Sequence, residues 1–397
     1  MDRRNFLKQS VFASGITLVP SFLKGMEFLT PEQLSGYKNV IIIQLSGGND
    51  GLNSIIPIQN DIYHRLRPTI GKKQSETLKI NDDLAFNSAL QPIKDLYDQG
   101  DVCIINNVGY PNPNRSHFRS TDIWQTASDT NQYLSSGWVG RYLDANCQHP
   151  YQAIEVDNSL SLAMKGNTLN GIAVSDPKQL HRTTREPFFN QLINNTQEDM
   201  LHEDNQGYLY KTMLETYSSA SYIYETSKIY ESKVTYPQSA FARNLKTIAD
   251  FIISGLKTRV YYSSLGGFDS HVNQVNSQDR LLGIYANAIS ALVKDLKKNN
   301  KFKDTLILTF SEFGRRVKQN GSRGTDHGAA NNVMIMSGSL KKAGIYNELP
   351  NLSDLDNNGD IKYTVDFRSI YASILDNWLE VNDHIILGSD FNKLSFV

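Results

Sequence analysis

The sequence predicts an α/β protein whose mostly parallel sheet is flanked by helices on both faces. Unbroken apolar runs rich in β-branched residues alternate along the chain with segments of helical spacing. Such runs are typical of buried parallel strands, and their alternation with helices is typical of strand–helix–strand units. The chain has 397 residues, a length that single α/β domains with insertions can reach.

The strand prediction is clearest at Asn39–Leu45, where a β-branched run passes directly into the turn Ser46-Gly47-Gly48-Asn49-Asp50-Gly51. Open α/β sheets place their chemistry at the carboxyl ends of strands, so we expect functional residues in the turns that follow strands. The other predicted strands are Val102–Val108, Ala153–Val156, Arg259–Ser263, Thr305–Phe310 and Val333–Ser337.

The helix prediction rests on apolar residues that recur at helical spacing. The predicted helices are Leu90–Tyr97, Arg115–Ala127, Gly137–Leu143, Gly207–Glu231, Ser239–Leu256, Leu281–Leu296 and Phe367–Leu379. Residues 60–85 are polar and are predicted to be a surface excursion. Residues 157–236 begin with a stretch rich in Asn, Gln, Thr and Ser, and we expect an inserted cap region there.

The N-terminus resembles a twin-arginine export signal. Asp2-Arg3-Arg4-Asn5-Phe6-Leu7-Lys8 precedes a weakly apolar stretch, with an amphipathic helix as the alternative. No clear cleavage site follows, so the segment could stay attached as a membrane anchor. We therefore expect a signal or anchor in residues 1–30, one α/β domain in residues 37–397, and a periplasmic, cell-envelope or secreted protein.

The overall charge argues against a nucleic-acid partner. The formal net charge is −1, the pI is about 6.7, and no basic stripe stands out. Cys103 and Cys147 show no metal-binding or redox spacing, and Cys103 lies in an apolar run typical of a buried strand.

Acids and histidines follow several predicted strands. Asp50, Asp269 with His271, and Glu312 come directly after strands, and a glycine-rich loop carries Asp326 and His327. Each motif alone is more often a turn or a cap, but parallel strands end at one edge, where these groups can converge. Carboxylates and imidazoles together suit zinc, manganese or similar divalent ions.

A calcium loop is a weaker possibility. The segment Asp354-Leu355-Asp356-Asn357-Asn358-Gly359-Asp360 resembles the first half of such a loop, but Val365 stands where a bidentate Glu is expected. A polar surface turn is the alternative interpretation.

Motifs along nearly the whole chain resemble the domain of unknown function 1501 family. They are Leu45-Ser46-Gly47-Gly48-Asn49-Asp50-Gly51, Asn114-Arg115-Ser116-His117-Phe118, Gly266-Gly267-Phe268-Asp269-Ser270-His271, Ser311-Glu312-Phe313-Gly314-Arg315, Gly324-Thr325-Asp326-His327-Gly328 and Thr364-Val365-Asp366-Phe367-Arg368. That family is grouped with the alkaline phosphatase and sulfatase superfamily and is exported by twin-arginine signals. The resemblance therefore implies an alkaline phosphatase-like sheet with a metal edge.

The resemblance also implies residue roles. Asp50 matches the metal aspartate after the first strand, Asp269 and His271 resemble a later aspartate and histidine pair, and Glu312 stands as a further ligand. Phe313 departs from the pattern, because a ligating histidine is usual at its position. Either Asp326 or His327 could replace that ligand.

The superfamily's nucleophile sits at a helix N-terminus after the second strand, where Ser116 lies. A helix N-terminus stabilises an anion, and Arg115, His117 or Arg119 could hold the transferred group. The alternative is that Ser116 is only an N-cap, and Ser46 is a poorer candidate because it precedes the glycines.

The resulting functional expectation is an exported metal-dependent hydrolase of phosphate or sulfate esters, in which Ser116 or a water on the metal attacks. Its partner would be a small-molecule or polymer ester. The alternative is a non-catalytic exported scaffold that keeps a degenerate site and binds an envelope protein.

Overall fold

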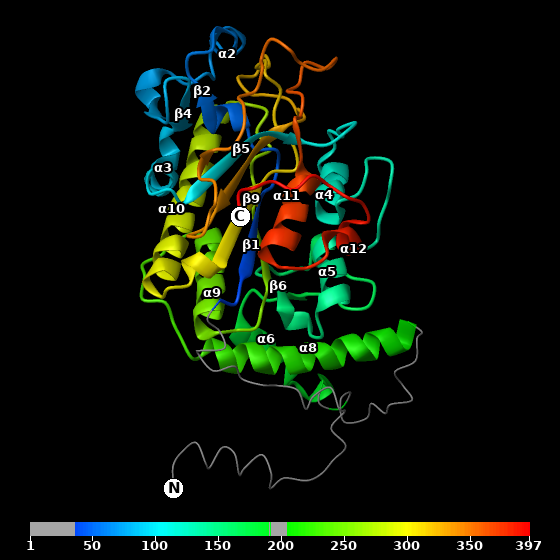
Figure 1. Ribbon diagram of the computed structural model, residues 1–397. Coiled ribbons are helices and arrows are strands. Elements are labelled where there is room, and N and C mark those ends of the chain that lie inside the picture. The colour runs from blue at the N-terminus through cyan, green and yellow to red at the C-terminus, as the bar shows by residue number, and fades with distance from the viewer. Residues whose placement is uncertain (1–35, 190, 192–204) are drawn as a thin grey trace. The chain divides into compact units, whose positions relative to one another are not determined.

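In the described part of the chain, residues 36–189, 191 and 205–397, a computed structural model shows a nine-stranded sheet between two layers of helices (Figure 1). The strand order is β11-β5-β10-β9-β1-β8-β6-β7, and β12 pairs with β5. The strands are β1 (Asn39–Leu45), β5 (Val102–Gly109), β6 (Ala153–Glu155), β7 (Ile172–Ala173), β8 (Val260–Leu265), β9 (Thr305–Phe310), β10 (Asn331–Met336), β11 (Gly344–Ile345) and β12 (Val365–Asp366). The predicted mostly parallel α/β sheet is confirmed.

The direction of β10 decides where the longest site loop lies. Strands β8 and β9 both pair with β1 in parallel, whereas β10 is antiparallel to β9 and β5. The chain passes from β9 to β10 through residues 311–330 without a helical crossover, so the next strand must run backwards. Both ends of this loop therefore lie at the edge where the parallel strands finish.

Two helical layers cover the sheet (Figure 1). One layer contains α3 (Gln91–Asp98), α9 (Ala240–Ser254) and α10 (Gln274–Lys298), and the other contains α4 (His117–Thr126), α5 (Trp138–Asn146), α11 (Phe367–Ser373) and α12 (Asp383–Leu387). In the second layer the Trp124 ring stacks on Phe310 of β9 and on Phe367 of α11, with centroids 4.6 and 4.3 Å away. Burial of each such side chain contributes about 1.5–3 kcal/mol, so this stack fixes α4 against the sheet.

The prediction that residues 60–85 are only a surface excursion is wrong. Helix α2 (Asp61–Leu66) and the strands β2 (Ile55–Pro57), β3 (Thr77–Lys79) and β4 (Leu84–Asn87) form a small subdomain with a sheet of order β2-β4-β3. Tyr63 and Arg67 are 0% and 1% exposed within it. One of the buried side chains in this segment is itself polar, the guanidinium of Arg67, and it pairs with the buried Asp50 carboxylate.

The described part of residues 157–236 contains β7, α6 (Pro177–Thr184) and α8 (Asn205–Ser227). The Tyr222 hydroxyl of α8 accepts a hydrogen bond from the Lys257 amide just before β8, and its ring lies 4.4 Å from that of Tyr151, just before β6. Helix α8 therefore packs at the amino ends of these strands, away from the acid-bearing turns. The predicted signal in residues 1–30 lies outside the described residues.

No helix within the described ranges is both long and apolar enough to cross a membrane.

Glu155 ends β6 with its side chain inside the fold. The residue is 5% exposed, and its Oε2 accepts a hydrogen bond of 2.6 Å from the Ser161 amide. Burial raises the pKa of Glu155 to about 7, from an ordinary 4.5. Below pH 4.5 the carboxyl is protonated in both the folded and the unfolded state, and as the pH rises to 7 the unfolded state loses its proton first.

We therefore predict that the free energy of unfolding contributed by Glu155 falls as the pH rises from 4.5 to 7. Glu155→Gln should stabilise the protein by up to about 3 kcal/mol at pH 8 and by almost nothing near pH 4.5. Urea unfolding of the wild type and the variant at both pH values measures the difference. An equal effect at the two pH values would show that Glu155 is not a buried titrating carboxyl.

Candidate metal centre and its cleft

The carboxyl ends of β8, β1 and β9 meet at one edge, because the three strands are parallel neighbours. A turn with an acid follows each: Asp269 after β8, Asp50 after β1 and Glu312 after β9. His117 opens α4 after β5, and His327 lies in the β9–β10 loop. The predicted acids and histidines are thus brought to a single edge of the sheet, but not to a single point.

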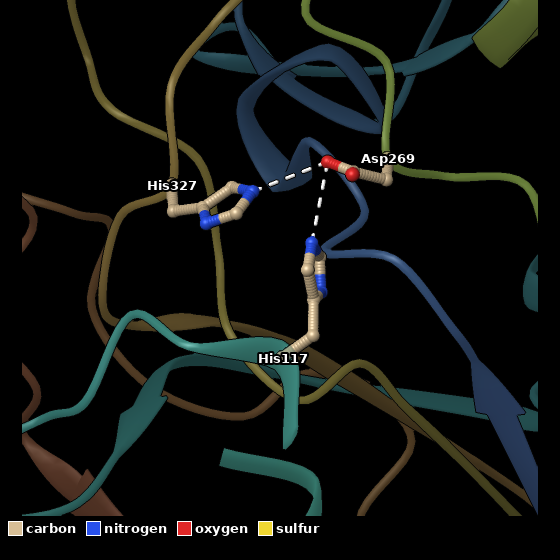
Figure 2. A group of neighbouring side chains, drawn as sticks. All are labelled: His117, Asp269 and His327. Atoms are coloured by element: carbon tan, nitrogen blue, oxygen red, sulfur yellow. Dashed lines mark hydrogen bonds and ion pairs between the residues drawn. The ribbon is translucent and has the colours of Figure 1, made fainter. Parts of the chain in front are cut away.

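Three imidazoles do meet at one point, the Oδ1 atom of Asp269. Nε2 of His271 lies 2.9 Å from this oxygen, Nε2 of His327 lies 3.1 Å from it, and Nε2 of His117 lies 3.3 Å from it. Figure 2 shows His117 and His327 approaching Asp269 from different chain segments. Three segments that are far apart in the sequence therefore supply one cluster.

The opposite nitrogens of two rings are held by acceptors. Nδ1 of His117 lies 2.8 Å from Oε1 of Glu312, and Nδ1 of His327 lies 2.8 Å from the carbonyl oxygen of Arg115. A carboxylate or a carbonyl can only accept, so each Nδ1 must carry the proton. In a neutral ring this leaves Nε2 with a lone pair, directed at the cluster.

The Nε2 lone pairs of His117 and His327 are available to a cation. Nε2 of His271 and Nε2 of His327 are 3.0 Å apart, and the buried Nε2 of His117 makes no hydrogen bond to any described atom. Tetrahedral zinc with bonds of 2.0–2.1 Å places its donors roughly 3.4 Å apart, close to the spacing in this cluster. The donor set of His117, His327 and the Asp269 carboxylate, whose ligand atoms all lie within 4.8 Å of one another, therefore fits a divalent ion, and zinc best.

The acceptors on Nδ1 strengthen this fit. Ligating histidines almost always donate their second N–H to a carboxylate or a carbonyl, which fixes the tautomer and orients the ring. Glu312 has this role for His117, and the pKa of His117 is raised chiefly by that hydrogen bond, against partial burial. Glu312, which the sequence suggested as a ligand, thus lies behind a donor and positions it.

Asp326 lies at the outer side of the cluster. Its Oδ1 is 3.7 Å from Nδ1 of His271, beyond hydrogen-bond distance, and its side chain is 54% exposed. Of the two loop residues considered as a replacement ligand, His327 reaches the cluster and Asp326 does not.

Arg315 ties the turns of this edge together. Its Nε donates to the Gly48 carbonyl at 2.6 Å, and its Nη2 donates to the Gly47 carbonyl at 2.5 Å and to Asp269 Oδ1 at 2.9 Å. Partial burial raises the pKa of Asp269, but the contacts with the His327 and Arg315 side chains outweigh it and hold that pKa well below its usual range. Asp269 is therefore an ionised carboxylate. No sequence pattern indicates that Arg315 has this role.

Gly47 is required by the close approach of two turns. Its φ is +116°, and a Cβ on it would lie 2.3 Å from the Asp269 amide nitrogen. The Gly47 amide also donates to Glu312 Oε1 at 2.8 Å. A larger residue here would displace both the cluster carboxylate and the carboxylate that orients His117.

Asp50 is not part of the cluster, contrary to the expectation that it is a ligand. Its Oδ2 accepts hydrogen bonds of 2.6 Å from Arg67 Nη1 and 2.6 Å from Gln274 Nε2. The Arg67 and Asp50 side chains are 0% and 2% exposed, so they form a buried ion pair. A guanidinium already neutralises this carboxylate, and breaking a buried pair of this kind costs about 3–5 kcal/mol.

The structure places the three residues expected to catalyse, Arg115, Ser116 and His117, in different surroundings. Ser116 is the exposed N-cap of α4, and its hydroxyl makes no capping hydrogen bond. Arg115 forms an ion pair with the fully buried Asp360 carboxylate. His117, expected to hold the transferred group, instead directs Nε2 at Asp269. The Arg115-Ser116-His117 pattern identifies the segment in the sequence. Which of the three side chains enters the cluster depends on how the first turn of α4 is rotated, and the structure shows that it is His117.

Phe313 forms an apolar wall of the cluster. Its ring centroid lies 4.8 Å from that of His117 and 4.7 Å from that of His327. The position where the resemblance led us to expect a histidine therefore carries no donor, but it confines the rings of two donors.

The segment suspected of being a calcium loop is held by contacts within the protein. Oδ1 of Asp356 accepts hydrogen bonds of 2.8 Å from the Asn358 and Asp360 amides, and Lys362 Nζ pairs with Asp354 at 2.5 Å. These contacts, with the pair between Arg115 and Asp360, describe the polar turn that was the alternative interpretation.

An open cleft of about 420 Å³ leads to the cluster. Its lining residues are Ser46, Gly47, His117, Phe118, Thr121, Asp122, Gly267, Asp269 and Glu312. A second cavity of about 380 Å³ shares Glu312 with it and has the aromatic walls Tyr110, Trp124, Phe313 and Tyr363. Ser46, the less favoured serine, lines the cleft, whereas Ser116 does not.

The chain is an α/β protein with a mostly parallel sheet. Acids and histidines lie at the carboxyl ends of its strands. Residues 102–387 match the family described as "Protein of unknown function (DUF1501)", and the chain belongs to that family. No curated protein gives a significant match.

Solved structures with a similar fold include three bacterial proteins. The lipoteichoic acid synthase LtaP from Listeria monocytogenes is 9% identical, with 98% of this chain and 81% of that chain covered and a TM-score of 0.42. The PsFucS1 sulfatase from Pseudoalteromonas sp. is 11% identical, covering 100% and 78%, with a TM-score of 0.39. The C-terminal periplasmic domain of EcEptC from Escherichia coli, in complex with Zn, is 11% identical, covering 76% and 73%, with a TM-score of 0.37.

We predict that protein purified without chelator binds a divalent ion through this cluster. Asp269→Ala should weaken zinc binding by more than about 100-fold, because it removes a donor, whereas removing a residue that only hydrogen-bonds to a donor typically costs about 10–100-fold. Metal analysis and zinc titration with a competing chelator measure the effect. Binding should also weaken below pH 6, where protons compete for the imidazoles.

Asp326→Asn is the matched control, because it removes an exposed carboxylate of the same region that lies behind His271. It should retain its metal, and both variants should give wild-type circular dichroism. Tight zinc binding by Asp269→Ala would contradict this assignment of the centre.

Proposed function

We propose that this protein is a metal-dependent hydrolase of phosphate or sulfate esters that acts outside the cytoplasm. The observation that carries the proposal is the set of three imidazole Nε2 atoms directed at one carboxylate oxygen beside an open cleft. A divalent ion at that point would polarise an ester oxygen and lower the pKa of a bound water.

The start of α4 supports an anionic substrate. Serine at position 116 makes no side-chain cap, and the amides of His117, Phe118 and Arg119 have no hydrogen-bond partner among the described residues. Free amides at a helix N-terminus and the positive end of the helix dipole attract oxyanions. His117 belongs to the same turn, so these amides lie beside the cluster and could hold ester oxygens.

Other residues at this edge of the sheet would act by holding the donor side chains in place. Glu312 holds the His117 ring, Arg315 holds the Asp269 carboxylate, and Phe313 keeps water from one side of two imidazoles. Ser116 has no neighbouring base, because both nitrogens of His117 face other groups. We therefore favour water over Ser116 as the attacking group.

A non-catalytic scaffold with a degenerate site is the second candidate, and Phe313 is the observation in its favour. Replacing an expected donor by phenylalanine removes one possible ligand. An envelope protein would then be the partner, in place of a small-molecule or polymer ester.

We predict that the zinc- or manganese-loaded protein hydrolyses 4-nitrophenyl phosphate, bis(4-nitrophenyl) phosphate or 4-nitrophenyl sulfate. Asp269→Ala should abolish turnover together with metal binding. Ser116→Ala should keep its metal and lose no more than about threefold in kcat if water attacks, but orders of magnitude if Ser116 is the nucleophile. A metal-loaded wild type that turns over none of the three esters would favour the scaffold.

Export is proposed from the sequence of the N-terminus. Arg3 and Arg4 should both be needed for delivery across the inner membrane, because the twin-arginine route reads the pair. Replacing both with Lys and fractionating the cells should show the protein retained in the cytoplasm. The wild type in a strain without the twin-arginine transporter is the control, and normal export there would contradict the proposal.

A further inference from the structure

The cleft contains fewer positive charges than an ester dianion needs. Its lining, among the described residues, includes no lysine and no arginine. Sites for doubly charged phosphates usually present guanidinium or ammonium groups, because these neutralise charge and donate to the oxygens. The positive charge available to a ligand here must therefore come from the bound ion and the start of α4.

Arg315 is the nearest guanidinium, but it is fully occupied. Besides Gly47, Gly48 and Asp269, it donates to the carbonyls of Thr325 and Phe268, at 2.9 and 3.0 Å. Its side chain is 1% exposed. It therefore neutralises Asp269 and cannot turn towards a ligand.

The two arginines that flank His117 are occupied as well. Arg115 forms its ion pair with the buried Asp360. Arg119 is 8% exposed and donates to the carbonyls of Asp129, Thr130 and Gln132. Neither guanidinium faces the cleft, so the expectation that Arg115 or Arg119 holds a transferred group finds no support in these contacts.

Negative charge, in contrast, is present in the cleft without compensation. Asp122 lines it from α4, one and a half turns after His117, and its carboxylate makes no hydrogen bond or ion pair with a described residue. Asp269 and Glu312 line the same cleft. A divalent ion and Arg315 together bring three positive charges against these three carboxylates, which leaves the cleft near neutral before a substrate enters.

We propose that the cleft selects esters that carry one negative charge, a sulfate monoester or a phosphate diester, over phosphate monoester dianions. This inference rests on the proposed hydrolase function and adds its substrate class. A second negative charge would share the cleft with Asp122, with no additional cation to offset the repulsion.

The activity test compares substrates with the same leaving group at pH 8 and low ionic strength. Bis(4-nitrophenyl) phosphate and 4-nitrophenyl sulfate are monoanions, whereas 4-nitrophenyl phosphate is a dianion, because its second ionisation lies near pH 6. We expect kcat/KM for at least one monoanion to exceed that for the dianion by more than about tenfold. The two monoanions separate sulfatase from diesterase activity, and a preference for the dianion would overturn the proposal.

Asp122→Asn tests the residue. It should raise the ratio of dianion to monoanion kcat/KM by about threefold to tenfold, because the dianion feels twice the repulsion. Glu225→Gln is the matched control, since it removes one negative charge on α8, at the amino ends of the strands, and should leave the ratio unchanged. An equal shift in both variants would mean that net charge, and not Asp122, sets the preference.

A binding measurement separates this inference from the hydrolase proposal. Dimethyl phosphate and methyl phosphate, titrated calorimetrically into the metal-loaded protein at pH 8, present one and two charges without turnover. Tighter binding of dimethyl phosphate, reversed or reduced in Asp122→Asn, supports the charge selection even if no ester is cleaved. Tighter binding of methyl phosphate, or no binding of either, overturns it.

Discussion

The meeting of three imidazole nitrogens at one oxygen of Asp269 is the contact on which the carboxyl edge of the sheet depends. The contributing turns follow β5, β8 and β9, and Arg315 ties the turn after β1 to them. No two of these segments are neighbours in the sequence, so their meeting is set by the parallel register of β8, β1 and β9. Any change in that register would separate the donors, and the cluster is therefore a property of the whole sheet.

Two aspartates at this edge illustrate how burial decides the kind of positive charge that a carboxylate receives. The Asp50 side chain is 2% exposed and is neutralised by a built-in guanidinium, since an unpaired charge in such a place is very costly. The Asp269 side chain is 47% exposed and lies at the mouth of a cleft. Water and ions can reach Asp269, so a cation that binds from solution can neutralise it. Asp50 is buried and is neutralised by the Arg67 guanidinium, which belongs to the protein itself.

Local patterns in the sequence predicted the strands, their common edge and the segments that carry the donors, because strand periodicity and glycine-rich turns are local properties. They could not predict the partners. The sequence predicts Asp50 as a ligand because it follows the first strand and matches the family's metal aspartate, but no pattern indicates that Arg67 is buried beside it. His117 is predicted to face the substrate because it lies at a helix N-terminus, but the sequence does not fix how the first turn of α4 is rotated. Both errors concern contacts between distant segments, where pattern carries no information.

The same contacts support the proposal that the cluster holds an ion. Without a cation, the Nε2 atoms of His117 and His327, whose Nδ1 atoms carry the protons, both direct a lone pair at the Asp269 carboxylate, an arrangement that repels. Protonating the rings would relieve the repulsion but would place several positive charges beside Arg315. The structure holds the rings of His117 and His327 by an acceptor on Nδ1, an arrangement typical of histidines that ligate a metal.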